Sequence, residues 1–354
     1  MRITETIWRS FRNLESRRQK WQPGLNVILG PNGSGKTNLL ESLNILCGWG
    51  AFEGGKLSSL VTWNSPDKHA FLAGQAKGER EIEVEARIGV RASLYAGNEK
   101  VTYSALRSLL PSLAFLPGDV GLLDGSPGSR RFFLDKLCAL CSPLYARRLA
   151  EYKQLVRHRT ALLRSSRGQS SLPESTALAL RATAVPLVRL GGWIRNVRRR
   201  AITLLAEKLS AESALLPCAV ELSLSMPEDM EEALAASLER ERHAGMVLVG
   251  PHRDDLIFSC RGRSASLALS RGQKRRVVMA AILAAGCLIE EKLRLKPILI
   301  LDDVTAELDA EGRELTGQAL TGTDWQVFAS AAGADAPFKG GSLLRVQDGR
   351  IFQG

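Results

Sequence analysis

Long apolar runs are missing from this sequence, and none reaches the roughly 20 residues that a membrane-spanning helix requires. The segment from Met1 to Lys20 is charged and interrupted, unlike a secretory signal peptide. We therefore expect a cytoplasmic protein that has no membrane partner.

Clusters of metal-ligating residues are also scarce, since the chain has only six cysteines and four histidines. The one pair at metal-like spacing, Cys138 and Cys141, has no second Cys or His pair to complete a four-ligand zinc site. Both lie in an apolar segment of helical character, which favours buried thiols over a redox or metal site. The cysteines imply no disulfide framework, and neither His158 nor His252 has a partner at ligand spacing.

Internal repeats, low-complexity tracts and heptads long enough for an extended coiled coil are absent as well. The content of 45% hydrophobic and 24% charged residues is typical of globular proteins and argues against disorder. The formal net charge of +11 favours a polyanionic partner, because clustered Lys and Arg gain affinity by displacing phosphate counterions. Nucleic acid is the leading candidate, and an anionic membrane surface is the second.

The pattern of hydrophobic residues changes twice along the chain. Unbroken or alternating apolar residues predict strands at 3–8, 25–29 and 81–88, and later at 219–225 and 298–301. Leu- and Arg-rich helical stretches run from 130 to about 165 and from 174 to about 210, and a Glu-rich helix covers 228–242. We predict an α/β fold in which a mostly helical arm interrupts a head built on a mixed sheet. The head comprises residues 1–125 and 246–354, and the arm comprises residues 126–245.

One glycine-rich segment matches the phosphate-loop pattern GxxxxGK[ST] in full. It consists of Gly30, Pro31, Asn32, Gly33, Ser34, Gly35, Lys36 and Thr37. The segment follows an apolar strand and opens a helix, which an accidental glycine-rich turn would not require. Backbone N–H groups would converge on the phosphates of ATP, Lys36 would reach the β and γ phosphates, and the Thr37 hydroxyl would ligate Mg²⁺.

The apolar strand at 298–301 ends in two carboxylates. Asp302 would hold Mg²⁺, mostly through water, and Asp303 would orient or polarise the attacking water. Apolar strands often end in solvated acids, so this pattern alone is weak evidence for a metal site. It becomes strong evidence because the same chain contains the phosphate loop.

The segment Leu269-Ser270-Arg271-Gly272-Gln273 precedes a further helix. Ser and Gly at a helix start leave N–H groups that suit a phosphate contact. The same residues also suit a plain helix N-cap, and taken alone the segment favours the cap.

The order of these motifs, followed by Glu307-Leu308-Asp309, resembles the head of ABC-type ATPases, in which the signature of one subunit closes over nucleotide held by the other. Within that superfamily the chain resembles the RecF family over nearly its whole length. The resemblance is carried by Phe11-Arg12-Asn13, the run from Gly30 to Glu41, Gly125-Ser126-Pro127 with Arg130-Arg131 and Phe133-Leu134-Asp135, Gly250-Pro251-His252-Arg253-Asp254-Asp255, and Asp302-Asp303-Val304.

The resemblance implies an SMC-like head with a short helical arm, in which ATP drives homodimerisation on double-stranded or gapped DNA. It implies that Arg12 and Asn38 join the phosphate loop in binding nucleotide. It further implies that Ser270, Gly272, Gln273 and Asp309 act in trans on the nucleotide of a second copy. The implied role is in DNA replication, recombination, repair and the SOS response, where mediators of the RecR and RecO type help to load recombinase at single-strand gaps or junctions. An SMC-like chromosome-architecture ATPase and, less favoured, a transporter ATPase subunit are the alternatives.

Three departures from the ABC pattern bear on catalysis. Leu14 stands where the family usually has an aromatic residue, and the segment 115–119 offers no Gln for the metal. Ala329-Ser330-Ala331 stands where transporter ATPases place a His that senses the γ phosphate. Together with an Asp at position 303, these departures imply slow hydrolysis by a switch rather than a motor, with Lys36 and Asp303 as the catalytic residues.

The predicted arm is rich in arginine, which suits bidentate contact with a nucleic-acid backbone. Arg147, Arg148 and Arg157 are our candidate DNA contacts within a larger set that includes Arg159, Arg195 and Arg198. A charged helix face is most often simply solvated, and this alternative remains open for each residue.

Overall fold

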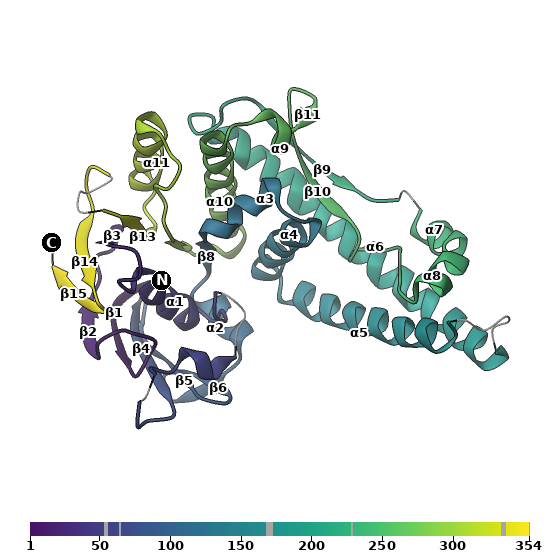
Figure 1. Ribbon diagram of the computed structural model, residues 1–354, viewed down its shortest axis with the longest axis horizontal. Coiled ribbons are helices and arrows are strands. Elements are labelled where there is room, and N and C mark those ends of the chain that lie inside the picture. The colour runs from purple at the N-terminus through teal and green to yellow at the C-terminus, as the bar shows by residue number, and fades with distance from the viewer. Residues whose placement is uncertain (53–55, 64, 168–172, 228, 334–337, 354) are drawn as a thin grey trace. The chain divides into compact units, whose positions relative to one another are not determined.

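The chain folds into two compact units (Figure 1), described here from a computed structural model. The structure describes all residues except 53–55, 64, 168–172, 228, 334–337 and 354. The first unit contains Met1–Val120, Ala211–Pro217 and Leu269–Gly354, and the second contains Gly121–Ser210 and Cys218–Ala268.

The first unit contains an antiparallel sheet with the strand order β2-β1-β4-β5-β6-β7. Its strands are β1 (Arg2–Arg9), β2 (Arg17–Lys20), β4 (Ala70–Lys77), β5 (Glu81–Ile88), β6 (Ala92–Ala96) and β7 (Glu99–Val101). Along β5, Val84, Ala86 and Ile88 are buried while Glu83 and Arg87 are exposed. The alternation in the sequence therefore correctly predicted a strand with one buried face.

The second sheet of this unit is mixed and has the order β15-β14-β3-β13-β12-β8. Its strands are β3 (Leu25–Gly30), β8 (Ser112–Phe115), β12 (Ile298–Leu301), β13 (Gln326–Ala332), β14 (Ser342–Gln347) and β15 (Arg350–Gln353). Only β15 runs antiparallel to its neighbour. Every residue of β3 and β12 is buried, as the unbroken apolar runs at 27–29 and 298–301 predicted.

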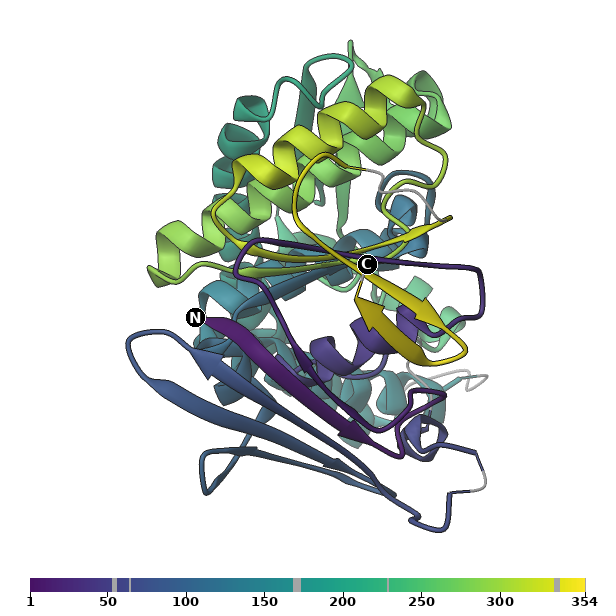
Figure 2. The ribbon, with the colours of Figure 1, turned by 90° about the vertical axis from the view of Figure 1, so that its left-hand side faces the viewer.

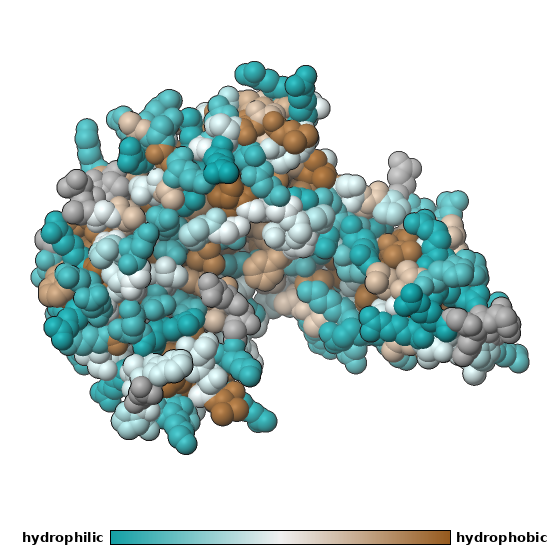
Figure 3. All heavy atoms as spheres, in the orientation of Figure 1, coloured by the Kyte–Doolittle hydropathy of each residue, from teal (hydrophilic) through white to brown (hydrophobic). Residues whose placement is uncertain are grey.

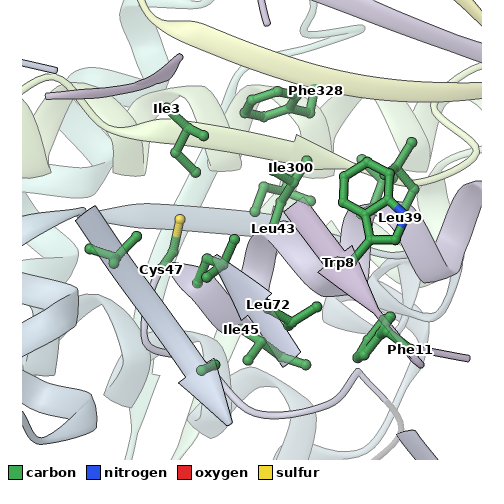
Figure 4. Packing of buried hydrophobic residues seen from close by; sticks show 14 of the residues in the cluster. Ile3, Trp8, Phe11, Leu39, Leu43, Ile45, Cys47, Leu72, Ile300 and Phe328 are labelled. Atoms are coloured by element: carbon green, nitrogen blue, oxygen red, sulfur yellow. The ribbon is translucent and has the colours of Figure 1, made fainter. Parts of the chain in front are cut away.

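The helix α1 (Lys36–Leu46) lies between the two sheets and contacts β4 and β5 on one side and β12 and β13 on the other (Figure 2). Its Leu39 and Leu43 pack with Trp8 and Leu72 of the antiparallel sheet and with Phe328 of the mixed sheet (Figure 4). The remaining helices of the unit are α2 (Tyr103–Leu109), α10 (Arg271–Leu293), α11 (Ala310–Gly322) and the 3₁₀ helices η1 (Leu57–Leu60) and η2 (Pro117–Val120). This core fixes the N-terminal end of α1 relative to the ends of β3 and β12.

The second unit is mainly helical and contains one small antiparallel sheet of order β11-β10-β9. Its elements are α3 (Gly121–Asp124), α4 (Pro127–Cys141), α5 (Pro143–Ser165), α6 (Glu174–Ala211), β9 (Val220–Ser225), α7 (Met230–Ala236), α8 (Leu238–Ala244), β10 (Asp255–Cys260), β11 (Arg263–Ser264) and α9 (Ala265–Ala268). The long helical stretch predicted from residue 130 is two helices, because Ser142 is extended and Pro143 begins α5. The predicted Glu-rich helix is also two helices, and residue 228, where we expected it to begin, lies outside the described part of the chain.

The return of the chain to the head occurs later than the sequence indicated. We expected residues from 246 onward to belong to the head, but residues 246–268 belong to the second unit. The reason is that β10 pairs with β9 and that Asp254 and Asp255 bind arginines of α6 and α4. Residues 247–250 form no strand, and the Val247 carbonyl accepts hydrogen bonds from Arg253.

A disulfide between Cys218 and Cys260 contradicts the expectation that the cysteines form no framework. The antiparallel register places Cys260 opposite Val220, so Cys218, just before β9, comes within reach. Cys138 follows the expectation of a buried thiol, and burial raises its pKa.

Within the described residues, one helix, α6, is long and apolar enough to cross a membrane by length and composition alone. About a third of the most apolar stretch of α6 is buried within the structure. Its Arg195 and Arg198 are buried and bind Asp254 and Asp135 of the same unit.

Candidate nucleotide-binding site

The glycine-rich loop lies between the end of β3 and the start of α1. Gly33 and Gly35 have backbone φ angles of 80° and 110°, which residues with a side chain rarely adopt. A Cβ atom at Gly30 would collide with the backbone carbonyl of Val346. Gly35 is the N-cap of α1 and provides no side-chain cap, so the first turn of the helix presents its N–H groups without that competition. This geometry suits an anion at the helix N-terminus.

Two polar side chains of the loop also indicate a binding site for an anion. The Lys36 ammonium donates to the carbonyl oxygens of Gly30 and Pro31 at 2.8 and 2.9 Å, and burial lowers its pKa while Asp302 and Asp303 oppose that shift. Among the described residues, no group bonds to the buried hydroxyl of Ser34. A buried hydroxyl of this kind needs a partner, and a phosphate oxygen would supply one.

Thr37 and Asp302 come together as the sequence predicted. The Thr37 hydroxyl donates to Asp302 Oδ2 at 2.8 Å, and the Asp302 side chain is almost fully buried. The parallel register pairs Leu301 with Ala329 and Gly30 with Ala332, so the two acids following β12 lie at the edge of the sheet that carries the phosphate loop. A hydroxyl and a carboxylate oxygen are hard ligands that fit Mg²⁺ bound mainly through phosphates and water.

Ser330 also belongs to this arrangement, although no sequence motif marked it for a role. Its hydroxyl donates to Asp302 Oδ1 at 2.5 Å and accepts from the backbone N–H of Asp303 at 2.9 Å. Ser330 is fully buried on β13, at the place where transporter ATPases have a His. The serine fixes the Asp302 carboxylate and the backbone of Asp303 together.

Asp303 differs from Asp302 in its surroundings. Its backbone has a φ of 47°, in the left-handed region, and no described residue hydrogen-bonds to its carboxylate. Arg275 of α10 donates to the Asp303 carbonyl, and its guanidinium lies 5.3 Å from the centre of the Phe115 ring. Burial lowers the pKa of Arg275. Arg275 thereby joins the start of α10 to the acidic turn after β12, and no sequence motif predicted this contact.

The signature-like segment forms the N-terminus of α10. Ser270 accepts from the Gln273 N–H at 3.3 Å, and the Gln273 side chain accepts from the Ser270 N–H at 3.0 Å, which together make a capping box. A Cβ atom at Gly272 would lie 3.0 Å from the Glu307 carbonyl, so the glycine allows a close approach of the helix to this turn. Asp309 likewise caps α11 by accepting from Gly312 at 2.7 Å. Within one chain, then, these residues act as helix caps.

The Phe-Arg-Asn segment is attached to α1. Arg12 makes two hydrogen bonds to the buried Glu41, at 2.8 and 3.2 Å, so its guanidinium is held by the helix. Asn38 donates to Asn13 at 2.8 Å, and Asn13 lies against Gly35 of the loop. Leu14 is buried and presents no ring for stacking.

The candidate DNA contacts lie on α5 in the second unit. The Arg147 side chain is 78% exposed and Arg157 is exposed, but Arg147 and Arg148 both pair with Glu151. The larger arginine set is divided, because Arg159, Arg195 and Arg198 are buried in ion pairs and are structural. Sequence alone gave no means of separating these buried arginines from the exposed ones.

Comparison with known proteins places the chain among RecF and SMC proteins. The sequence family described as RecF/RecN/SMC N terminal domain matches residues 2–348. The DNA replication and repair protein RecF of Moorella thermoacetica is 33% identical over 325 residues, which cover 89% of this chain and 86% of that protein. A relative of the same name from Anaeromyxobacter sp. (strain Fw109-5) is 33% identical over 367 residues, covering 96% of each chain.

A solved structure described as the recombination mediator protein RecF-ATP in the RecFOR pathway superposes with a TM-score of 0.85 at 23% identity, covering 99% of this chain and 97% of that one. The fold is therefore that of an ABC-type ATPase head. The sequence matches are long enough to establish kinship as well as fold. This chain belongs to the RecF family of DNA replication and repair proteins.

Proposed function

We propose that this protein binds ATP with Mg²⁺ and hydrolyses it slowly. The observation that carries the proposal is the hydrogen-bonded group of Thr37, Asp302 and Ser330 beside a phosphate loop whose Ser34 hydroxyl lacks a partner among the described residues. Thr37 and Asp302 would hold Mg²⁺, which neutralises charge on the β and γ phosphates when bound. Lys36 binds the same phosphates, and Asp303 orients the attacking water.

Slow turnover follows from the residues around the water. Asp303 stands where the ABC pattern has the longer Glu, and its carboxylate has no hydrogen-bonding partner among the described residues. Ala329, Ser330 and Ala331 of β13 include no His that could sense the γ phosphate, and the Ser330 hydroxyl is bonded to Asp302. A long-lived ATP state suits a switch that reports whether nucleotide is bound.

We further propose that ATP closes two copies on each other, with Ser270, Gly272, Gln273 and Asp309 of one copy facing the nucleotide of the other. The exposure of Ser270 and of the Arg271 side chain, 84% exposed, supports this role. Ser270 and Asp309 are exposed at the N-termini of α10 and α11, where a second copy could reach them.

The partners proposed for the closed dimer are gapped or double-stranded DNA and mediators of the RecR and RecO type, in the cytoplasm. The relatives that bear the RecF name and the structure placed in the RecFOR pathway support this assignment. The net charge of +11 and the exposed Arg147 and Arg157 support backbone binding independent of sequence. The transporter alternative loses its support because the match covers the helical arm.

The trans contact is tested with Ser270→Arg. The variant should bind ATP as wild type does but remain monomeric with ATP, as measured by light scattering, because the bulky cation occupies the phosphate-facing N-terminus. Its control is Thr102→Arg, which removes an exposed cap of α2 in the same unit. Each change costs about 1 kcal/mol of helix stability. ATP-dependent dimerisation by Ser270→Arg would return this residue to the role of a helix cap alone.

A further inference from the structure

A groove on the second unit is unused by any of the roles proposed above. It has a volume of about 550 Å³ and lies between α6 on one side and α7 and α8 on the other. Leu180 and Val188 of α6 face Leu234 and Leu238 across it. The volume is in the range of sites that bind ligands or peptide side chains.

The α6 wall is a continuous helical stripe. Ala177, Leu180, Ala184 and Val188 follow one another at intervals of three and four residues, which places them on one face over about three turns, or roughly 16 Å. Val185 lines the same wall and is 73% exposed. Figure 3 shows hydrophobic residues gathered over α6, α7 and α8 with hydrophilic residues around them. Exposed apolar surface of this kind usually marks an interaction site.

The charges at the edge of the groove are predominantly positive. Arg181 and Arg189 lie two turns apart on α6 and are exposed, and no described residue forms an ion pair with either. Arg159 also reaches the groove, but its charge is balanced by the buried Glu241 at 3.1 Å. Glu231 on the α7 side is the one acidic side chain that lines the described groove.

We propose that this groove binds an amphipathic helix of a partner protein, whose apolar residues enter between α6 and α7–α8 and whose acidic residues pair with Arg181 and Arg189. Helices recognised in this way present apolar residues at intervals of three and four, which the stripe on α6 matches in length. Nucleic acid would satisfy the arginines but would leave the apolar walls unfilled.

The inference is independent of the nucleotide site, since every residue that carries it belongs to the second unit. Binding should therefore persist in Lys36→Ala and in the absence of ATP. If the protein did not bind ATP at the phosphate loop, the groove could still bind a partner helix. If the groove bound no helix, the proposal for the nucleotide site would likewise stand.

The experiment is a selection from a phage-displayed library of random peptides of about 16 residues, a length that forms four helical turns. The full-length protein is the bait, and Val185→Glu is used for counter-selection because its exposed position tolerates substitution. We expect enriched sequences with apolar residues three or four apart and a net negative charge. Enriched sequences without this pattern, or ones that bind Val185→Glu equally well, would overturn the proposal.

The selected peptide is then titrated by fluorescence anisotropy. Arg181→Glu and Arg189→Glu should each weaken binding at least roughly tenfold, whereas Arg200→Glu, an exposed residue of α6 outside the groove, should not. Circular dichroism checks that each variant is folded. Sedimentation of the protein without nucleotide tests whether a second copy of this chain fills the groove. Self-association that Val185→Glu abolishes would assign the groove to a second copy and overturn the proposal of a separate partner.

Discussion

Ser330→Ala tests whether the buried serine on β13 organises the magnesium ligand. The substitution removes the hydrogen bond from the Ser330 hydroxyl to Asp302 and the one that it accepts from the Asp303 N–H. It leaves the site's recognised motifs, the phosphate loop and both acids, unchanged in sequence. Any effect of the substitution on the affinity for nucleotide therefore arises from a change in the position of Asp302 and Asp303.

The magnitude follows from the burial of both partners. A hydrogen bond to a charged group contributes about 1.5–3 kcal/mol, and a neutral one about 1 kcal/mol, so the variant should lose about 2–4 kcal/mol of stability. For a domain of this size class the melting temperature should fall by roughly 5–15 °C. Disordering of Asp302 should also weaken the affinity for Mg-ATP at least roughly tenfold, which reduces the ATP-dependent stabilisation by about 1.4 kcal/mol.

The assay is thermal unfolding with and without Mg-ATP, paired with a direct titration of ATP. Ser42→Ala is the matched control, since Ser42 is a fully buried serine of α1 whose hydroxyl donates only to the Leu39 carbonyl. That variant should lose stability but keep its ATP affinity. If Ser330→Ala bound Mg-ATP as tightly as wild type, the reasoning that Ser330 positions Asp302 would be refuted.

Three further outcomes follow from other parts of the molecule. Lys36→Ala should abolish tight ATP binding in a calorimetric titration, whereas Lys77→Ala, an exposed lysine of β4, should not. The DNA affinity of the wild-type protein should fall steeply with added salt. The double variant Arg147→Glu, Arg157→Glu should show a shallower slope of log K against log salt, and an unchanged slope would show that α5 is not part of the DNA interface. Burial lowers the pKa of His252, so the unfolded chain takes up a proton that the folded chain does not, and stability should decline as pH falls below about 6.5. Denaturant titrations at pH 7.5 and 5.5 should show this decline in wild type and a smaller one in His252→Gln, with the exposed His158→Gln as control.

The parts of the fold that could be predicted were those fixed by local pattern. The apolar sequences of β3 and β12 and the alternation of β5 identified three strands, and the glycines of the phosphate loop identified the turn before α1. These signals are local because strand periodicity and glycine conformation depend on neighbouring residues.

The parts that could not be predicted depend on residues far apart in sequence. The disulfide between Cys218 and Cys260 requires the register of β9 on β10, and the late return to the head requires the same pairing. Arg195 resembles an exposed arginine in sequence but binds Asp254, 59 residues away, in a buried pair. Ser330 could have been considered because it lies on an apolar strand that ends beside the phosphate loop, but its bond to Asp302 depends on the parallel register of β12 and β13.

The central claim is that nucleotide times the closure of two copies on DNA. Sedimentation velocity with and without ATP, in the presence and absence of a gapped duplex, tests it most directly. The protein should sediment as a monomer without nucleotide, as a dimer with ATP, and together with the gapped duplex only when ATP is present. Equal binding to the duplex with and without ATP, or a monomer in every condition, would contradict the claim.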